Sequence, residues 1–241
     1  MEQPDGQAGS LLVISPHLDD AVLGCGELLA ATPGAVVLSI FSGAGKDPTI
    51  STNWDTACGF ESAQQALSAR LMEDDAALGL LDARPLRLNF PDDQYRGESE
   101  TVDLEALADA IHSVLQRYKP QVVAIPLGLF HRDHALAHEA ALRLFAKYSA
   151  ECAWLAYEDA FYRRIPGLLQ QRLCSLASAG CVATPLGTPR KASTTIKRLA
   201  VQCYASQLRG LGSPGRPGHL DALAPEGYWR LAPVTQPEVA R

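Results

Sequence analysis

The sequence lacks the features of nucleic-acid-binding and membrane proteins. Among its 241 residues, 27 acidic side chains outnumber 21 basic ones, which gives a formal net charge of −6. No run of lysine or arginine is long enough to follow a phosphate backbone, so no nucleic-acid partner is expected. No apolar run approaches membrane-spanning length, and residues 1–10 are polar and acidic, unlike a secretory signal. These absences predict a soluble, cytoplasmic protein with no membrane span.

Paired cysteines are also absent. The chain has no C-x-x-C motif, and four of its six cysteines stand beside apolar neighbours in expected strands or helices. We therefore expect buried thiols, with no role as metal ligands or in disulfides, at the following positions: Cys25, Cys58, Cys152, Cys174, Cys181 and Cys203.

Several common catalytic signatures are missing. There is no G-x-S-x-G elbow, no G-x-G-x-x-G after the first expected strand, and no H-E-x-x-H helix. Residues 42–47 are similar to a phosphate-binding loop, but Asp47 stands where that loop needs serine or threonine. The usual serine hydrolases, dinucleotide enzymes and thermolysin-like proteases are thereby excluded.

The order of apolar segments predicts the fold class. With 47% hydrophobic residues and no change of composition that would mark a domain boundary, the chain is expected to form one domain over residues 1–241. Short β-rich runs alternate with helix-period segments, which predicts an α/β, three-layer, Rossmann-like fold: a mostly parallel sheet with helices on both faces. The expected strands are 11–15, 35–41, 86–90, 121–126 and 152–157, and the clearest helices are about 58–80, 103–117 and about 190–208.

The end of the chain has a different composition. Glycine and proline are frequent after residue 208 and forbid regular structure until the pair Tyr228-Trp229. We expect residues 211–241 to form a Gly/Pro-rich C-terminal extension whose aromatic side chains pack in the core.

Two polar clusters carry the chemistry. Each follows a run that reads as a buried strand: Pro16-His17-Leu18-Asp19-Asp20 and His131-Arg132-Asp133-His134. Imidazole and carboxylate groups in this number are what a protein needs to hold zinc with one position open for water. The first cluster alone could be a helix N-cap, in which Asp19 and Asp20 accept the free N–H groups. The second favours a metal site, because a helix start does not need two histidines three residues apart.

The two clusters are expected to lie close together, since ligands of open α/β sheets bind beyond the carboxyl ends of the strands. Other polar residues reach the same edge, and individually we expect them to be solvated turn residues: Asp92, Asp93, Glu158 and Asp159. His138, four residues after His134, is expected on the surface of the helix among alanines.

The chain resembles the LmbE-like or PIG-L-like zinc-dependent N-acetylglucosaminyl deacetylases. That family carries a Pro-His-Pro-Asp-Asp-Glu motif after the first strand and a His-x-Asp-His motif later. The second motif matches in full, whereas Leu18 and Ala21 replace the proline and the glutamate of the first. The resemblance is specific at the motifs and extends over about the first 160 residues. It implies that His17, Asp20 and His134 hold Zn²⁺ or another divalent transition metal.

The resemblance also implies that Asp19 is the general base and that His131 stabilises or protonates the reacting group. Elementary chemistry agrees, because three protein ligands leave a fourth position for water, whose pKa falls to about 7. Adjacent side chains point in different directions, so Asp19 is free to take a proton from that water. We expect Asp133 to orient a protonated His131, which predicts a bell-shaped pH profile.

The predicted function is hydrolysis of the amide of an N-acyl amino sugar, with release of an acetyl or related acyl group. The small-molecule substrate would be an N-acetylglucosamine-type glycoconjugate, an antibiotic precursor or a sugar-linked thiol. Two alternatives remain open: a metal-dependent hydrolase of another bond, and a non-catalytic sugar or nucleotide binding module. The sequence also leaves open whether the protein is a homo-oligomer.

Overall fold

The strands form one mixed sheet. The computed structural model describes residues 10–97, 99–187 and 192–234. Its seven-stranded sheet has the order β3-β2-β1-β4-β5-β7-β6. Strands β1 to β5 are parallel, and β7 runs antiparallel to both β5 and β6. Their bounds are β1 Leu11–Ser15, β2 Val36–Ser39, β3 Arg84–Arg87, β4 Val122–Pro126, β5 Ala153–Tyr157, β6 Cys181–Leu186 and β7 Tyr228–Pro233.

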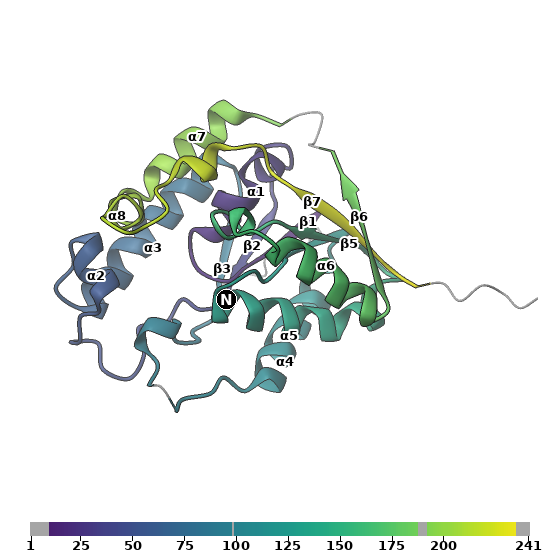
Figure 1. Cartoon of the computed structure of the whole chain (residues 1–241), viewed down its shortest axis with the longest axis horizontal. Coiled ribbons are helices and arrows are strands. Elements are labelled where there is room, and N and C mark those ends of the chain that lie inside the picture. The colour runs from purple at the N-terminus through teal and green to yellow at the C-terminus, as the bar shows by residue number, and fades with distance from the viewer. Residues whose placement is uncertain (1–9, 98, 188–191, 235–241) are drawn as a thin grey trace, which may run out of the picture.

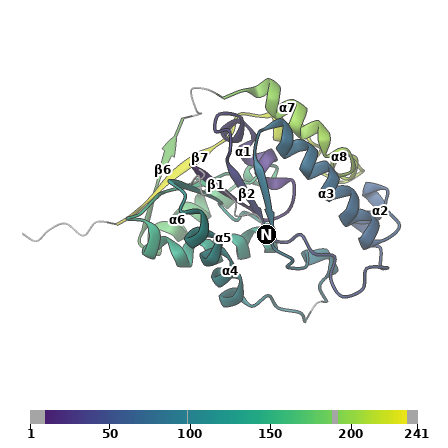
Figure 2. The ribbon, with the colours of Figure 1, turned by 180° about the vertical axis from the view of Figure 1, so that it is seen from behind.

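Helices cover both faces of the sheet, as predicted (Figures 1 and 2). On one face, α1 and α3 pack against α7, and on the other α4 packs against α5. Helix α6 packs beside β6, and the short helices α2 and α8 contact each other. The bounds are α1 Asp20–Ala30, α2 Asn53–Cys58, α3 Ala63–Leu80, α4 Leu104–Tyr118, α5 Arg132–Tyr148, α6 Leu168–Ser178, α7 Thr194–Cys203 and α8 Ala205–Leu211. The α/β, three-layer prediction is confirmed.

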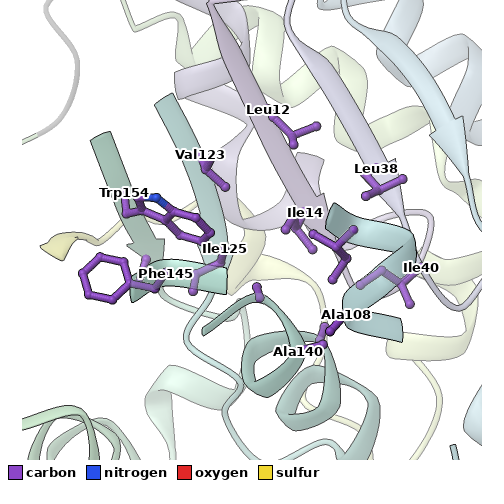
Figure 3. Close-up of a cluster of buried hydrophobic side chains, with 14 of the residues drawn as sticks. Leu12, Ile14, Leu38, Ile40, Ala108, Val123, Ile125, Ala140, Phe145 and Trp154 are labelled. Atoms are coloured by element: carbon purple, nitrogen blue, oxygen red, sulfur yellow. The ribbon is translucent and has the colours of Figure 1, made fainter. Parts of the chain in front are cut away.

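Alternate residues of the central strands enter two separate cores. Leu12 and Ile14 of β1 pack with Val123 of β4 in the core under α4 and α5 (Figure 3). Leu11 and Val13 enter the other core, which α1, α3 and α7 complete. Because both faces are covered, these strands read as continuous apolar runs, and that is why β1 and β4 could be located from the sequence.

Two expected helices are divided in the structure. The helix expected over about 58–80 is α2 followed by α3, because Gly59 adopts a left-handed conformation (φ 88°) and the Ser62 side chain caps α3. The helix expected over about 190–208 corresponds to α7 and α8, and its first two residues lie outside the described residues. The third strand ends earlier than predicted, and beyond it Phe41 and Asn89 form only an isolated bridge.

The expected C-terminal extension includes a strand at residues 228–233. These residues form β7, which pairs with β5 on one side and β6 on the other. Of the aromatic pair expected to pack in the core, Tyr228 is buried and Trp229 is half-buried against the core. The Gly/Pro-rich segment before β7 is therefore a connection to an interior strand.

All six cysteines are unpaired. Cys25, Cys58 and Cys181 are buried as predicted, but Cys174 is exposed, and the remaining two are half-buried. Within the described ranges, no helix has the length and apolar character needed to cross a membrane.

Candidate metal centre

The two polar clusters meet where the order of the parallel strands reverses. Strand β1 lies between β2 and β4, so the chain proceeds to one side of β1 first and to the other side later. His17 follows β1, and His131 is the N-cap residue of α5, which follows β4. Such a reversal opens a crevice at the carboxyl ends of the strands, where ligands of this fold class bind. The topology thus brings together residues that are far apart in the sequence.

Three ligand atoms converge in this crevice. His17 Nδ1 and His134 Nε2 lie 3.0 Å and 3.1 Å from the same oxygen, Asp20 Oδ2. All three residues offer ligand atoms within 4.8 Å of one another. Around an ion with bonds of about 2.1 Å, neighbouring ligand atoms are about 3.0 to 3.4 Å apart. The spacing therefore fits one small cation held by the three residues expected from the sequence.

Each of the two imidazoles is fixed by a second carboxylate. His17 Nε2 lies 3.0 Å from Asp133 Oδ2, and His134 Nδ1 lies 2.6 Å from Asp159 Oδ1. Metal-binding histidines are commonly oriented in this way through the nitrogen that faces away from the ion. The expectation that Asp159 is a solvated turn residue is wrong, since it is only 1% exposed. Its position directly beyond β5 was the available signal.

The carboxylate of Asp133 orients His17, whereas the sequence predicted that it would orient His131. One oxygen accepts from the Asp93 backbone N–H at 2.9 Å, and the other accepts from the guanidinium of Arg96. Burial alone would raise the pKa of Asp133, but His17 and Arg96 hold that pKa at about 2. Asp133 is therefore a carboxylate whose negative charge is matched by a buried arginine.

His131 has a defined tautomer. Its Nδ1 accepts the backbone N–H of Asp133 at 3.2 Å, which leaves the proton of the neutral ring on Nε2. Burial and the positive charges of His17 and His134 lower the pKa of His131 to about 4. The expectation of a protonated His131 is therefore wrong: near neutral pH it is a neutral hydrogen-bond donor. The bell-shaped pH profile required activity to fall at high pH as His131 loses its proton. A neutral His131 gives no reason to expect that fall.

The carboxylates of the first cluster do not cap the helix as the alternative interpretation requires. Asp19 is the N-cap residue of α1, yet its side chain makes no capping hydrogen bond. Asp20 Oδ2 instead accepts from the backbone N–H of His17 at 2.9 Å. Asp19 faces the pocket, and burial together with the charge of Asp20 raises its pKa. A carboxylate of that kind is suited to accept a proton.

The electrostatic field of the cluster favours a positive charge. Burial lowers the pKa of His134, but the carboxylates of Asp20 and Asp159 outweigh that effect and raise it to about 9. Burial also opposes protonation of His17, yet nearby carboxylates hold its pKa well above the usual value. The surrounding carboxylates therefore favour a positive charge at this point. Protonated imidazoles can supply that charge, and a bound cation would supply it instead.

A pocket of about 450 Å³ opens over these residues. Its lining includes the polar residues Arg70, Asp92 and Gln94, and Arg70 Nη1 donates to Asp92 Oδ2 at 3.1 Å. The lining also includes the aromatic residues Phe130 and Tyr162. This volume is typical of pockets for small molecules.

Sequence reasoning misplaced several of the surrounding polar residues. Asp92 is 6% exposed and belongs to the pocket wall, so its expected place in a solvated turn is wrong. Asp93 pairs with Arg96, and Glu158 accepts from the Trp229 indole. His138 is buried, contrary to expectation, and its Nδ1 lies 2.8 Å from the carbonyl oxygen of Pro126.

Arg96 supports the metal centre through Asp133. Its guanidinium is almost fully buried and also contacts Asp93 and the carbonyl oxygen of Pro91.

We expect Arg96→Gln to weaken metal binding by about ten-fold, which is the smallest effect typical of changes to groups that orient metal ligands. Without Arg96, Asp133 would lose its countercharge and hold His17 less firmly. Chelator competition measures the affinity. The matched control is Arg132→Gln, since Arg132 approaches Asp93 from outside at 3.4 Å without a hydrogen bond to Asp133. Equal affinities in the two variants would contradict this role.

Comparison with known proteins gives a family and a fold. The family described as PIG-L, GlcNAc-PI de-N-acetylase, matches residues 12–145, which is more than half of the chain. A search of curated proteins found no match.

Three solved structures illustrate the similarity. Teicoplanin deacetylase Orf2, in a zinc-inhibited form, is 24% identical with a TM-score of 0.73, over 92% of this chain and 98% of that one. The N,N'-diacetylchitobiose deacetylase from Pyrococcus horikoshii is 15% identical with a TM-score of 0.55, over 97% and 88% of the two chains. The 4-carboxy-2-hydroxymuconate hydratase GalB from Pseudomonas putida is 19% identical with a TM-score of 0.56, over 95% and 99%. At these sequence identities the similarity shows only that the folds are alike.

Proposed function

Because the chain belongs to the PIG-L family of GlcNAc-PI de-N-acetylases, and is thereby a metal-dependent N-deacetylase, we propose that it uses zinc to remove the acetyl group of an N-acetylated amino sugar. The observation that carries this proposal is the convergence of His17, Asp20 and His134 on one point beside the uncapped carboxylate of Asp19. A pocket that held a sugar without reaction would not need that carboxylate next to three metal ligands.

The donor set fits zinc. Two imidazoles and one carboxylate are a common ligand set of catalytic zinc sites, and each imidazole already has the carboxylate partner that such sites use. His17, Asp20 and His134 would hold the ion. When bound, zinc would lower the pKa of water to about 7 and polarise the amide carbonyl. A second group, His17 with His131 and Asp133, is a weaker candidate because Asp133 is already neutralised by Arg96.

Two residues of the chain have separate roles in the reaction: one transfers protons and the other stabilises the developing negative charge. Asp19 takes the proton from the attacking water, and its raised pKa makes it a stronger base than an ordinary carboxylate. His131 Nε2–H donates a hydrogen bond to the carbonyl oxygen as negative charge grows there. The proton held on Asp19 can pass to the departing amine, so the products are acetate and an amino sugar.

The polar residues of the pocket lining suit a sugar. Arg70 offers N–H donors and Asp92 offers acceptors in a fixed ion pair, and Gln94 Nε2 donates to the same Asp92 carboxylate at 3.3 Å. Sugar hydroxyls both donate and accept, so they match a wall with both kinds of group. These groups would orient the ring so that its amide lies over the metal ligands.

The test is acetate release by the purified protein loaded with zinc. We expect one equivalent of bound metal, and equal amounts of acetate and free amine from methyl N-acetylglucosaminide. Zinc is added stepwise from one equivalent, because the Orf2 structure is of a zinc-inhibited form. A fold relative is a hydratase, so both products must be measured. Metal binding without release of acetate or amine from any N-acetylated amino sugar would contradict the proposal.

A further inference from the structure

Two aromatic side chains, which we call the lip, line the pocket beside the candidate metal ligand His134. We define the lip as Phe130, from the loop after β4, and Tyr162, from the loop after β5. Their ring centroids lie 5.3 Å apart, and the Tyr162 ring meets that of His134 edge-on at 5.2 Å. The lip is therefore continuous with the site where the amide reacts.

The backbone that presents the lip is strained at two places. Phe130 has φ 61°, and the N–H of His131 donates to the carbonyl oxygen of Leu129 at 2.7 Å. Phe161 has φ 68°, and the N–H of Tyr162 donates to the carbonyl oxygen of Ala160 at 2.9 Å. Both are three-residue turns centred on a phenylalanine with positive φ, a conformation that is rare for a bulky residue.

Buried carboxylates hold both turns in place. Asp159 Oδ2 accepts from the N–H of Leu129 at 3.0 Å, while its other oxygen holds His134. Asp221, 7% exposed, accepts from the N–H of Phe161 at 2.7 Å. Asp159 thus fixes the position of the lip relative to the metal ligand. Strain that is maintained in this way is characteristic of functional sites.

Packing of the lip within the protein does not explain the strain. The Phe130 side chain is 70% exposed, so it gains little from burial in the structure described. An exposed aromatic ring beside a reactive pocket is expected to be covered by a ligand. Ile165 and Leu211 line the same pocket and add to its apolar surface.

Resting on the proposed function, we propose that the lip binds an apolar group carried by the amino sugar, so that the enzyme selects amphipathic substrates over simple N-acetylated sugars. Arg70 and Asp92 offer the donors and acceptors that a sugar ring needs, whereas Phe130 and Tyr162 offer apolar surface to the apolar group. This group can come from two sources, the aglycone or an acyl chain longer than acetyl. Both offer the same apolar surface to Phe130 and Tyr162.

Three substrates distinguish the two sources. Methyl N-acetylglucosaminide is the reference, phenyl N-acetylglucosaminide carries the apolar aglycone, and methyl N-octanoylglucosaminide carries the apolar acyl chain. We expect one of the last two to have a kcat/KM at least about ten-fold above the reference, a factor typical of added apolar contact in a pocket. The favoured substrate identifies the source.

Variants at Phe130 test the lip itself. Asparagine tolerates a positive φ better than most residues but is polar, so Phe130→Asn should lower the preference for the apolar substrate by about ten-fold, mainly through KM. Phe130→Leu should restore part of the preference. Met72, exposed on α3 and outside the pocket, supplies the control Met72→Ala, which should change nothing. A wild-type enzyme without preference, or an equal loss for all substrates in Phe130→Asn, would overturn the proposal.

A binding experiment separates this proposal from the proposed function. Phenyl glucoside has no amide, so its affinity for the zinc-loaded protein does not depend on hydrolysis. Calorimetry should show tighter binding of phenyl glucoside than of methyl glucoside, and Phe130→Asn should remove the difference if the apolar group is an aglycone. For an acyl group the matched pair is sodium octanoate and sodium acetate. No difference within either pair would overturn the lip, whereas a difference without turnover would refute only the deacetylase reaction.

Discussion

Asp19→Asn is expected to lower kcat by about a hundred-fold to ten-thousand-fold, the range for loss of a general base, while the protein keeps its metal. The amide has the shape of the carboxylate but cannot take the proton from water. Asp19 is next to Asp20 in the sequence, but it is not one of the three residues whose ligand atoms converge. Neutralising Asp19 therefore leaves all three candidate ligands in place. Burial already raises the pKa of Asp19, so removal of its charge should cost little stability.

The measurement combines turnover with metal content. Asp109→Asn is the control, because Asp109 is an exposed residue of α4, outside the pocket, and the substitution makes the same chemical change. We expect Asp19→Asn to bind one equivalent of zinc and to hydrolyse methyl N-acetylglucosaminide at the reduced rate, whereas the control should match the wild type. Loss of zinc would identify Asp19 as a ligand. Full activity would place the base on another residue.

The meeting of the two clusters could be predicted because it depends on topology. Parallel strands that follow one another through helices bring their carboxyl ends to one edge, and residues directly after β1 and β4 must then be neighbours. Side-chain partners within that edge could not be predicted. Asp133 faces His17 and presents only its backbone N–H to His131, and this choice depends on how α5 begins. Sequence spacing alone suggested the opposite arrangement.

The residues that sequence reasoning missed share a physical property: their partners are distant in the chain. β7 pairs with β5 only after a long Gly/Pro-rich segment, and its own residues do not indicate which strand it joins. Asp159 and Arg96 look like ordinary polar loop residues, and they become part of the site only through contacts with His134 and Asp133. Local pattern identified the candidate metal ligands, whereas the groups that orient them could be found only in the folded structure.

His134→Ala is expected to reduce metal binding to an undetectable level and therefore to abolish activity. His134 Nε2 is one of only two imidazole nitrogens in the ligand set, and it shares Asp20 Oδ2 as a neighbour with His17. Loss of an outer-shell partner weakens metal binding by about 10–100-fold, and we expect loss of a direct ligand to exceed that range. A single imidazole and one carboxylate would remain, too few to fill three positions of a zinc site.

The apoprotein must be measured separately, because His134→Ala also leaves the buried carboxylate of Asp159 and the half-buried carboxylate of Asp20 without their shared imidazole. We therefore expect the variant to be less stable without metal, and the informative quantity is the increase in Tm on addition of zinc. At a zinc concentration of 100 times Kd, the wild type should gain about 2.7 kcal/mol. His134→Ala should gain almost nothing, and His112→Ala should gain as much as the wild type, because His112 pairs with Tyr148 on α5, outside the pocket. A full zinc-induced gain in His134→Ala would remove His134 from the ligand set and move the ion to the group formed by His17, His131 and Asp133.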